Sequence, residues 1–441
     1  MDLMNKNLLM LKIDLAVNSG PFKQDPKLVA AIDKLFYNNT KEVLGEAVLL
    51  PERKLDFTEV NQLLKQTPVE NGNDKSLDNV IKETYNNRKN ILRKIETFLG
   101  DINKRAEEGD TPKLIIRNQR LWSNCVYDLD RVTLKELEIA KTTTIQYSRA
   151  EDKSRFNTIV FVLTRVHELI TKNLTVTRRE LYYQNVARFR NQGDLDIGVR
   201  DVCCLLECPP WDLGIVATAK GLIAGPLKIV NNDGSVTDCS TSGGTLVPQD
   251  IHNIKEFKTS AKYILVVEKD AVFQKLLDEG ALVRLRPVII ITGKGYPDVC
   301  TRQLLCRLVS ELKLKALALV DADPHGYEIF LTYKYGSLAQ SHLSSSLACP
   351  KLLLLGARHQ DVMTLAPKAS RLVLTALDKR KLVSLLARPY LNTAMGSHIK
   401  QELKAMLDSG VKAEIEALAS SAAALCDSYL PSKIIQAEYL G

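Results

Sequence analysis

The chain has 441 residues, of which 45% are hydrophobic and 25% are charged, with a formal net charge of +8. That length predicts two or three domains with proper cores, and no apolar run approaches the ~20 residues that a membrane helix needs. The N-terminus lacks the long apolar core and small-residue cleavage site of a secretory signal. The positive net charge is compatible with nucleic acid as a partner, but many enzymes carry a similar charge.

Residues 1–83 mix short apolar pieces with turn-rich stretches such as residues 71–74, so we expect a variable, partly flexible region. Residues 84–110 contain an amphipathic helix, predicted over 84–106. Its apolar residues recur at helical spacing: Ile91, Ile95, Phe98, Leu99 and Ile102. Such a helix either packs on its own domain or docks on a partner protein, and the pattern leaves both open.

Residues 111–230 are predicted to be mostly helical, with one long helix over 156–174. Thr177 is followed three residues later by Glu180, which is the pattern of a capping box, so a new helix should begin there. Short strands with a Gly-rich turn follow over 213–230. Two helices joined by a turn and followed by such strands predict a winged-helix domain, with these strands as its wing.

Residues 231–258 are rich in turn residues and predict a linker or an irregular hairpin. From 259 to 441 the pattern changes to strands alternating with helices, which predicts a parallel, doubly wound sheet with helices packed on it. The fold class is therefore α/β plus α+β. The strands are expected at 263–267, 288–292, 316–320 and 352–355, and the helices at 271–279, 301–313, 327–335 and within 375–441.

Three carboxylates follow the strands of this predicted sheet. Glu268 comes directly after the first strand, and Asp321 and Asp323 come after the third. Ligands of an open parallel sheet bind beyond the carboxyl ends of its strands, so the three should meet on one rim. Taken singly, each is more often a structural residue than a ligand. Together they favour a magnesium site, because magnesium prefers hard oxygen ligands.

The second strand ends in Thr292-Gly293-Lys294-Gly295. Glycines there would let the backbone approach a phosphate, and Lys294 could neutralise one. The spacing is not that of a nucleotide-binding P-loop, and no other segment supplies one. We therefore do not expect the chain to hydrolyse ATP by itself.

Tyr182 and Tyr183 stand side by side on the helix predicted to begin after Thr177. They point about 100° apart, so one can be core and the other exposed. The common role of such a pair is packing. The alternative is a phenol that attacks a phosphodiester, and with a pKa near ~10 it would need a cation nearby. Arg179 lies four residues before Tyr183, on the same helical face, where it could hold a phosphate.

Nine cysteines are scattered along the chain, an odd number without paired spacing. Cys203, Cys204 and Cys208 form the only cluster, and no second cluster of Cys or His lies near it. A structural zinc site is therefore not expected. Reduced thiols in an intracellular protein are the better interpretation.

The segments that carry this chemistry resemble the topoisomerase VI A-subunit family. Residues 177–183 resemble its tyrosine motif, and residues 266–271 and 321–327 resemble its Toprim metal motifs. The likeness covers roughly residues 85–440, with further matches at 220–225, 292–298, 388–390 and 412–418. Residues 321–326, Asp-Ala-Asp-Pro-His-Gly, resemble the same segment of the eukaryotic meiotic branch of the family (the Spo-eleven type). Archaeal members more often carry Gly between the two aspartates. Glu180 departs from the family's usual Asp.

The resemblance implies a Toprim domain over 259–441 and a DNA transesterase. Tyr183 would be the nucleophile, leaving a 5′-phosphotyrosyl link and a free 3′-hydroxyl without ATP. Magnesium would be held by the three carboxylates. Arg179 would assist catalysis, and the further candidates for contact with DNA are Arg178, Lys220, Lys294 and His325.

The resemblance also implies partners. Two copies of the chain would share active sites, the tyrosine of one working at the metal site of the other on double-stranded DNA. The helix at 84–110 would meet a topoisomerase VI B-like subunit, and meiotic accessory proteins would join. We expect programmed meiotic double-strand breaks, made in the nucleus, that initiate recombination, and no membrane. The alternatives are the A component of an active topoisomerase VI that reseals DNA with an ATPase partner, a catalytically inactive DNA-binding scaffold, and a Toprim nuclease that uses water.

Overall fold

The computed structural model describes residues 75–127 and 131–441. Residues Asn79–Gly441 form one compact unit. The expectation of a partly flexible segment at 1–83 falls almost wholly outside the described residues. Within the described ranges, no helix combines the length and apolar character that a membrane crossing requires.

Helix α4 (Lys75–Glu107) confirms the predicted amphipathic helix and begins earlier than expected. Its apolar stripe packs on the domain that follows, with Ile91 and Ile95 buried. The Lys94 Nζ donates to the backbone oxygen of Leu206 at 3.0 Å. Packing on its own domain is thus established, and docking on a partner stays a prediction.

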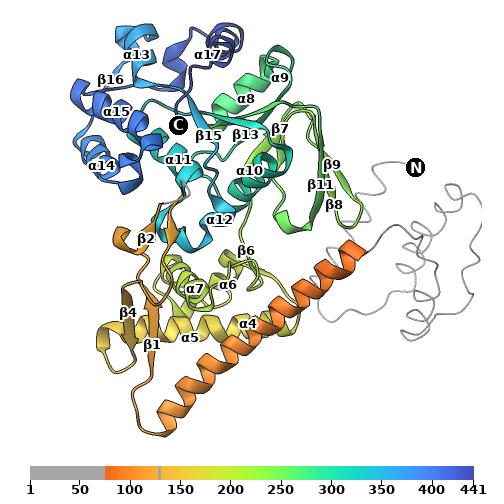
Figure 1. Cartoon of the computed structure of the whole chain (residues 1–441), viewed down its shortest axis with the longest axis vertical. Helices are drawn as coiled ribbons and strands as arrows, with labels where there is room; N and C mark the ends of the chain where they lie inside the picture. The colour runs from red at the N-terminus through yellow and green to blue at the C-terminus, as the bar shows by residue number, and fades with distance from the viewer. Residues whose placement is uncertain (1–74, 128–130) are drawn as a thin grey trace, which may run out of the picture. The chain divides into compact units, whose positions relative to one another are not determined.

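The next core is mainly helical and holds the tyrosine pair. Helices α5 (Ala150–Thr171), α6 (Arg178–Tyr183) and α7 (Gln192–Leu206) share one apolar cluster with α4, and Figure 1 shows them close together. Two small sheets complete it: β1 (Lys113–Arg117) with β4 (Thr142–Gln146), antiparallel, and β5 (Val176–Thr177) with β6 (Ile215–Val216), parallel.

The second core is built around a six-stranded sheet in the order β10-β7-β13-β12-β14-β15. Four of its strands run parallel, which confirms the doubly wound prediction: β12 (Tyr263–Val267), β13 (Val288–Thr292), β14 (Lys315–Leu319) and β15 (Leu352–Gly356). The connections are α8 (Asp270–Asp278), α10 (Val299–Leu312) and α11 (Pro324–Tyr335). In this strand order, the right-handed crossovers that parallel strands favour place α8 on one face and α10 and α11 on the other. Both faces are covered, which is why the strands are nearly continuous apolar runs.

The expected wing over 213–230 is wrong, because its three strands lie in three different sheets. Strand β6 pairs with β5, the strand at Leu227–Asn231 pairs with later strands, and β7 (Leu222–Ala224) pairs antiparallel with β13 and so belongs to the large sheet. Its continuous apolar run suits burial inside a sheet, and Ile223 and Ala224 are fully buried. Strand β10 (Thr245–Leu246) pairs beside it.

Residues 231–258, for which we weighed a linker against an irregular hairpin, contain regular strands. Strands β8 (Leu227–Asn231), β9 (Val236–Asp238) and β11 (Ile254–Thr259) form a three-stranded antiparallel sheet. The β8–β9 connection is a hairpin, so the hairpin alternative fits this segment. The domain boundaries themselves stay predictions.

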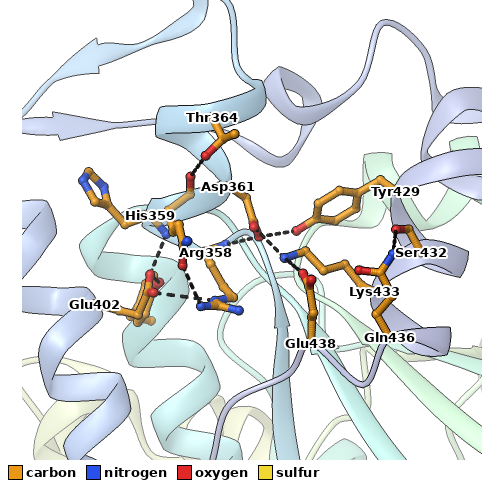
Figure 2. Close-up of polar contacts among 12 residues, drawn as sticks. Arg358, His359, Asp361, Thr364, Glu402, Tyr429, Ser432, Lys433, Gln436 and Glu438 are labelled. Carbon is orange, nitrogen blue, oxygen red and sulfur yellow. Dashed lines mark hydrogen bonds and ion pairs between the residues drawn. The ribbon is translucent and has the colours of Figure 1, made fainter.

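The C-terminal helices share the apolar core of the sheet, and polar contacts tie two of them to helix α13, His359–Leu365 (Figure 2). Glu402 of α15 (Ala394–Ser409) accepts from the His359 N–H at 2.7 Å, at the start of α13. Lys433 of α17 (Leu430–Ile435) lies 2.6 Å from Asp361 and 2.8 Å from Glu438. The prediction that residues after 375 pack on the sheet is confirmed.

Further short elements connect these parts: β2 (Cys125–Val126), β3 (Thr133–Leu134), α9 (Ala281–Arg284), α12 (Ser344–Leu347), β16 (Leu372–Val373), α14 (Ala376–Leu386), β17 (Val411–Lys412) and α16 (Ala422–Ala424).

Candidate active site

The helix that ends in the tyrosine pair begins where the sequence predicted. The Thr177 hydroxyl accepts from the Glu180 N–H at 3.1 Å, and the Glu180 carboxylate accepts from the Thr177 N–H at 3.4 Å. This reciprocal capping box satisfies two backbone donors at the start of α6. Glutamate at position 180 therefore preserves the cap despite its departure from the family pattern.

The two tyrosines take different environments. Tyr182 is half-buried, with its ring centroid 6.4 Å from that of Phe189. Tyr183 is 70% exposed, at the last residue of α6. The expected division into a packing tyrosine and an exposed one is confirmed, and Tyr183 is the phenol that a DNA strand can reach.

The arginines before the pair also differ. Arg179 is exposed and four residues before Tyr183, so both lie on one side of α6. Arg178 is half-buried and faces Asp196 of α7, with its nearest nitrogen 3.8 Å from a carboxylate oxygen. Arg179 is therefore the better placed of the two to meet a phosphate.

Glu268 lies where strand β12 ends. Its N–H donates to the Leu319 oxygen at 3.0 Å, and its Oε2 accepts from the Asp321 N–H at 2.8 Å. Burial raises the pKa of Glu268 to about 8, and the negative charges of Asp321 and Asp323 add to the effect. The two predicted strand ends thus bring their carboxyl groups together.

Asp321 is also buried, and burial raises its pKa to about 6. Its Oδ1 accepts from the Ile415 N–H at 2.9 Å, and its Oδ2 lies 3.0 Å from the ammonium of Lys269. Asp323 caps α11, with its Oδ1 accepting from the Gly326 N–H at 2.7 Å.

Gly326 shows how closely these groups approach. A Cβ at this position would lie 2.4 Å from the Asp321 backbone oxygen and 2.8 Å from Glu268 Oε2. No side chain fits there, so the start of α11 can rest directly against both acidic residues.

Two of the basic candidates, Lys220 and Lys294, lie near the carboxylates at the same edge of the sheet. The Lys220 Nζ donates to the Lys294 backbone oxygen at 3.4 Å, and Lys294 Nζ lies 3.1 Å from Asp270. The neighbouring Gly295 N–H donates to the backbone oxygen of Glu268 at 2.8 Å, which fixes this loop beside the residue that carries the carboxylate. The loop takes left-handed backbone conformations, with φ of +54° at Lys294 and +86° at Gly295. Such conformations are favourable for glycine and costly for lysine.

His325 is exposed in the first turn of α11, two residues after Asp323. Its Nδ1 lies 3.4 Å from the Tyr296 hydroxyl. Reading the strands to their ends predicted the carboxylates and Lys294 at this edge of the sheet, whereas Lys220 and His325 were expected from the resemblance.

The carboxylates fit magnesium by chemistry, since all three offer hard oxygens and two have pKa values raised by burial and by neighbouring acids. Across residues 75–127 and 131–441, however, no three His, Cys, Asp or Glu side chains are grouped so as to hold a metal ion. In this metal-free chain the two oxygens of Asp321 contact Lys269 and the Ile415 N–H. Sequence reasoning missed Lys269, although it directly follows Glu268.

Tyr183 and the carboxylates belong to different cores. Tyr182 and Leu181 pack in the helical core, whereas the residues flanking Glu268 and Asp321 pack in the sheet core. Among the hydrogen bonds and ion pairs of the described residues, none joins Tyr183 to the three carboxylates. The nine cysteines are free thiols, and those of the 203–208 cluster are buried.

Comparison with known proteins adds to this geometry. The family model for the Toprim domain that Spo11 shares with the A component of topoisomerase 6 matches residues 263–434, and the one described as "Type IIB DNA topoisomerase" matches residues 154–215. The meiotic recombination protein SPO11 of Mus musculus is 38% identical over 347 residues, covering 78% of this chain and 87% of the mouse protein.

Two proteins of Arabidopsis thaliana are similar to this chain, to nearly the same extent as each other. The meiotic recombination protein SPO11-1 is 34% identical over 354 residues, covering 78% of this chain and 95% of that protein. The A component of DNA topoisomerase 6 is 33% identical over 356 residues, covering 79% of this chain and 81% of that protein.

Proposed function

Since the chain belongs to the family of Spo11 proteins and topoisomerase VI A subunits, we propose that it makes meiotic double-strand breaks by DNA transesterification. The observation that supports this most is that one chain carries both an exposed tyrosine, Tyr183, and the carboxylates at the sheet edge, of which Glu268 and Asp321 are buried. Each lies in the segment that resembles the corresponding family motif. The names of the mouse and plant relatives favour a meiotic role.

The reaction exchanges one phosphodiester for another. The Tyr183 oxygen attacks the phosphorus as its proton leaves, the bond from phosphorus to the 3′ oxygen breaks, and that oxygen takes up a proton. The products are a 5′-phosphotyrosyl link and a 3′-hydroxyl, so the energy of the phosphodiester is kept and ATP is not needed. Arg179, on the face of Tyr183, would hold the phosphate.

Glu268, Asp321 and Asp323 would hold magnesium, which when bound stabilises charge on the phosphate and on the leaving oxygen. The family resemblance also implies that Glu268 would assist proton transfer. Lys220, Lys294 and His325 would contact the DNA backbone beside this site.

The cutting unit would be a homodimer with shared sites, as the resemblance to the topoisomerase VI A-subunit family implies. The position of Tyr183 and the carboxylates in separate cores of one chain agrees with this. Mixed dimers test this. A Tyr183→Phe chain paired with an Asp321→Asn chain retains one complete shared site and should nick one strand. If each site were built within one chain, the same mixture would cut nothing. Dimers of either variant alone are the matched controls.

The main test is to recover broken DNA from meiotic cells and ask whether this chain is covalently attached at the 5′ ends. Tyr183→Phe should abolish the attached breaks, and Tyr182→Phe should largely keep them. Breaks without attached protein would instead indicate a nuclease that uses water. Covalent breaks that persist in Tyr183→Phe would exclude Tyr183 as the nucleophile.

A second candidate is the A component of an active topoisomerase VI, favoured by the 33% identity to the plant topoisomerase. The chemistry would be the same, but the strands would be resealed with an ATP-hydrolysing partner. Relaxation of supercoiled DNA by the purified complex would support it. For both candidate functions we expect a topoisomerase VI B-like subunit to bind α4 and the chain to be located in the nucleus, where the DNA is. Meiotic accessory proteins are expected only for the first candidate.

A further inference from the structure

Lys269 joins three carboxylates at the edge of the candidate metal site. Its Nζ lies 3.0 Å from Asp321 Oδ2, 3.2 Å from Glu414 Oε2 and 3.4 Å from Glu416 Oε2. Burial alone would lower the pKa of Lys269, but the three acids outweigh it and the pKa is raised. The ammonium therefore stays charged and is held from several sides.

The two glutamates reach this place because their backbone is paired with the aspartate segment. The Ala413 N–H donates to the Ala322 oxygen at 3.1 Å, and the Ile415 N–H donates to Asp321 Oδ1 at 2.9 Å. These contacts fix the 413–416 segment against Asp321. The family match at residues 412–418, to which the reaction gave no role, thus has a defined position at the site.

The acids around Lys269 differ in their exposure to solvent. The Asp321 side chain is 8% exposed, whereas those of Glu416 and Glu414 are 38% and 58% exposed. The ammonium therefore contacts one buried carboxylate and two carboxylates that reach the solvent. A small shift toward Glu414 and Glu416 would free Asp321 without leaving the ammonium unpaired.

We propose that Lys269 is the resident cation of Asp321 in the metal-free chain, and that Glu414 and Glu416 retain its ammonium when magnesium replaces it. The inference rests on the proposed function only in taking Asp321 as a metal ligand. An ammonium and a divalent ion repel each other strongly when both contact one oxygen in a partly buried site. Lys269 and magnesium therefore compete for Asp321, and the glutamates lower the cost of moving Lys269 away.

Three sets of variants separate the roles. Lys269→Met removes the competitor and should tighten magnesium binding. The double substitution Glu414→Gln and Glu416→Gln leaves Lys269 with Asp321 alone and should weaken magnesium binding about tenfold, given two partly exposed ion pairs. In the Lys269→Met background the same two substitutions should have little effect, because they act through Lys269.

The experiment is a calorimetric titration of the full-length chain with magnesium chloride, without DNA. The rise in melting temperature caused by magnesium serves as a second readout for variants of low stability. Lys269→Arg keeps the charge and pairs more firmly with carboxylates, so it should weaken binding. Lys275→Met, which changes an exposed lysine on the helix that follows Lys269, is the control and should change nothing.

Two results would overturn the inference: weaker magnesium binding in Lys269→Met, or an equal loss from the glutamate substitutions with and without Lys269. The second would make the glutamates direct ligands. An unmodified chain that binds no magnesium would refute both the site and the inference. If the variants show the predicted changes in magnesium affinity but the unmodified chain does not cut DNA, the proposed function is refuted and the inference about Lys269 stands.

Discussion

Replacing Glu268 with glutamine should stabilise the metal-free chain, and increasingly so as the pH rises. The folded chain holds Glu268 buried beside Asp321 and Asp323, which raises its pKa from 4.5 to about 8. Glutamine keeps the size of the side chain, and its amide oxygen can still accept from the Asp321 N–H, which is 2.8 Å from Glu268 Oε2. It carries no charge to repel the two aspartates.

The magnitude follows from the two pKa values. A difference of about 3.5 units at roughly 1.4 kcal/mol per unit makes ionised Glu268 cost on the order of 5 kcal/mol in the folded chain. Because the folded chain holds this proton more tightly than the unfolded chain, stability falls as the pH rises. The loss begins above pH 4.5, where the unfolded chain ionises, and is complete above about pH 8. The advantage of glutamine should grow over that window and then level off.

Urea unfolding of both chains with a metal chelator at pH 5, 6, 7, 8 and 9 measures this difference. Asp278→Asn, which changes an exposed carboxylate on α8, is the control and should show no such trend. A difference between Glu268→Gln and the unmodified chain that stays flat from pH 5 to pH 9 would refute the reasoning, because Glu268 would then not be held against other acids. With magnesium present, the unmodified chain should recover the lost stability, whereas the variant should respond weakly.

Three further substitutions test the scaffold of the site. Thr177→Ala removes the cap of α6 and should cost about 1 kcal/mol in a denaturant melt, whereas exposed Thr175→Ala should cost almost nothing. Gly326→Ala forces a Cβ against the Asp321 backbone and Glu268, so it should cost roughly 1–3 kcal/mol and abolish magnesium binding by calorimetry; unchanged binding would contradict the close approach. Lys433→Met leaves Asp361 charged and buried and should cost roughly 3–5 kcal/mol, and adding Asp361→Leu should cost less than the sum of the two single changes.

Much of the sheet core could be predicted because its strands are short apolar runs bounded by turns. The bounds of β12 and β13 agree with the predicted 263–267 and 288–292, and the carboxylates follow from reading each strand to its end. The cap at Thr177 was equally local, because its two partners are three residues apart. Features set by neighbours in sequence are the ones that a sequence pattern can reach.

What escaped prediction depends on contacts between distant segments. Strand β7 was expected in a wing, but its pairing with β13 joins residues far apart in the chain. Lys269 was passed over because its partners, Glu414 and Glu416, lie about 145 residues further on and reach it only through the backbone pairing of Ala413 with Ala322. The sequence motif at 412–418 signalled importance without signalling where it would dock.

In the proposed reaction, Tyr183 becomes joined to the 5′ end of the broken strand. Mass spectrometry of the peptide that remains on the DNA after proteolysis identifies the residue that carries the link. We expect a nucleotide on Tyr183 through a phosphotyrosyl bond, and its loss in Tyr183→Phe. That variant should be as stable as the unmodified chain because Tyr183 is 70% exposed. A nucleotide on any other residue, or broken 5′ ends without attached peptide, would contradict the proposed reaction.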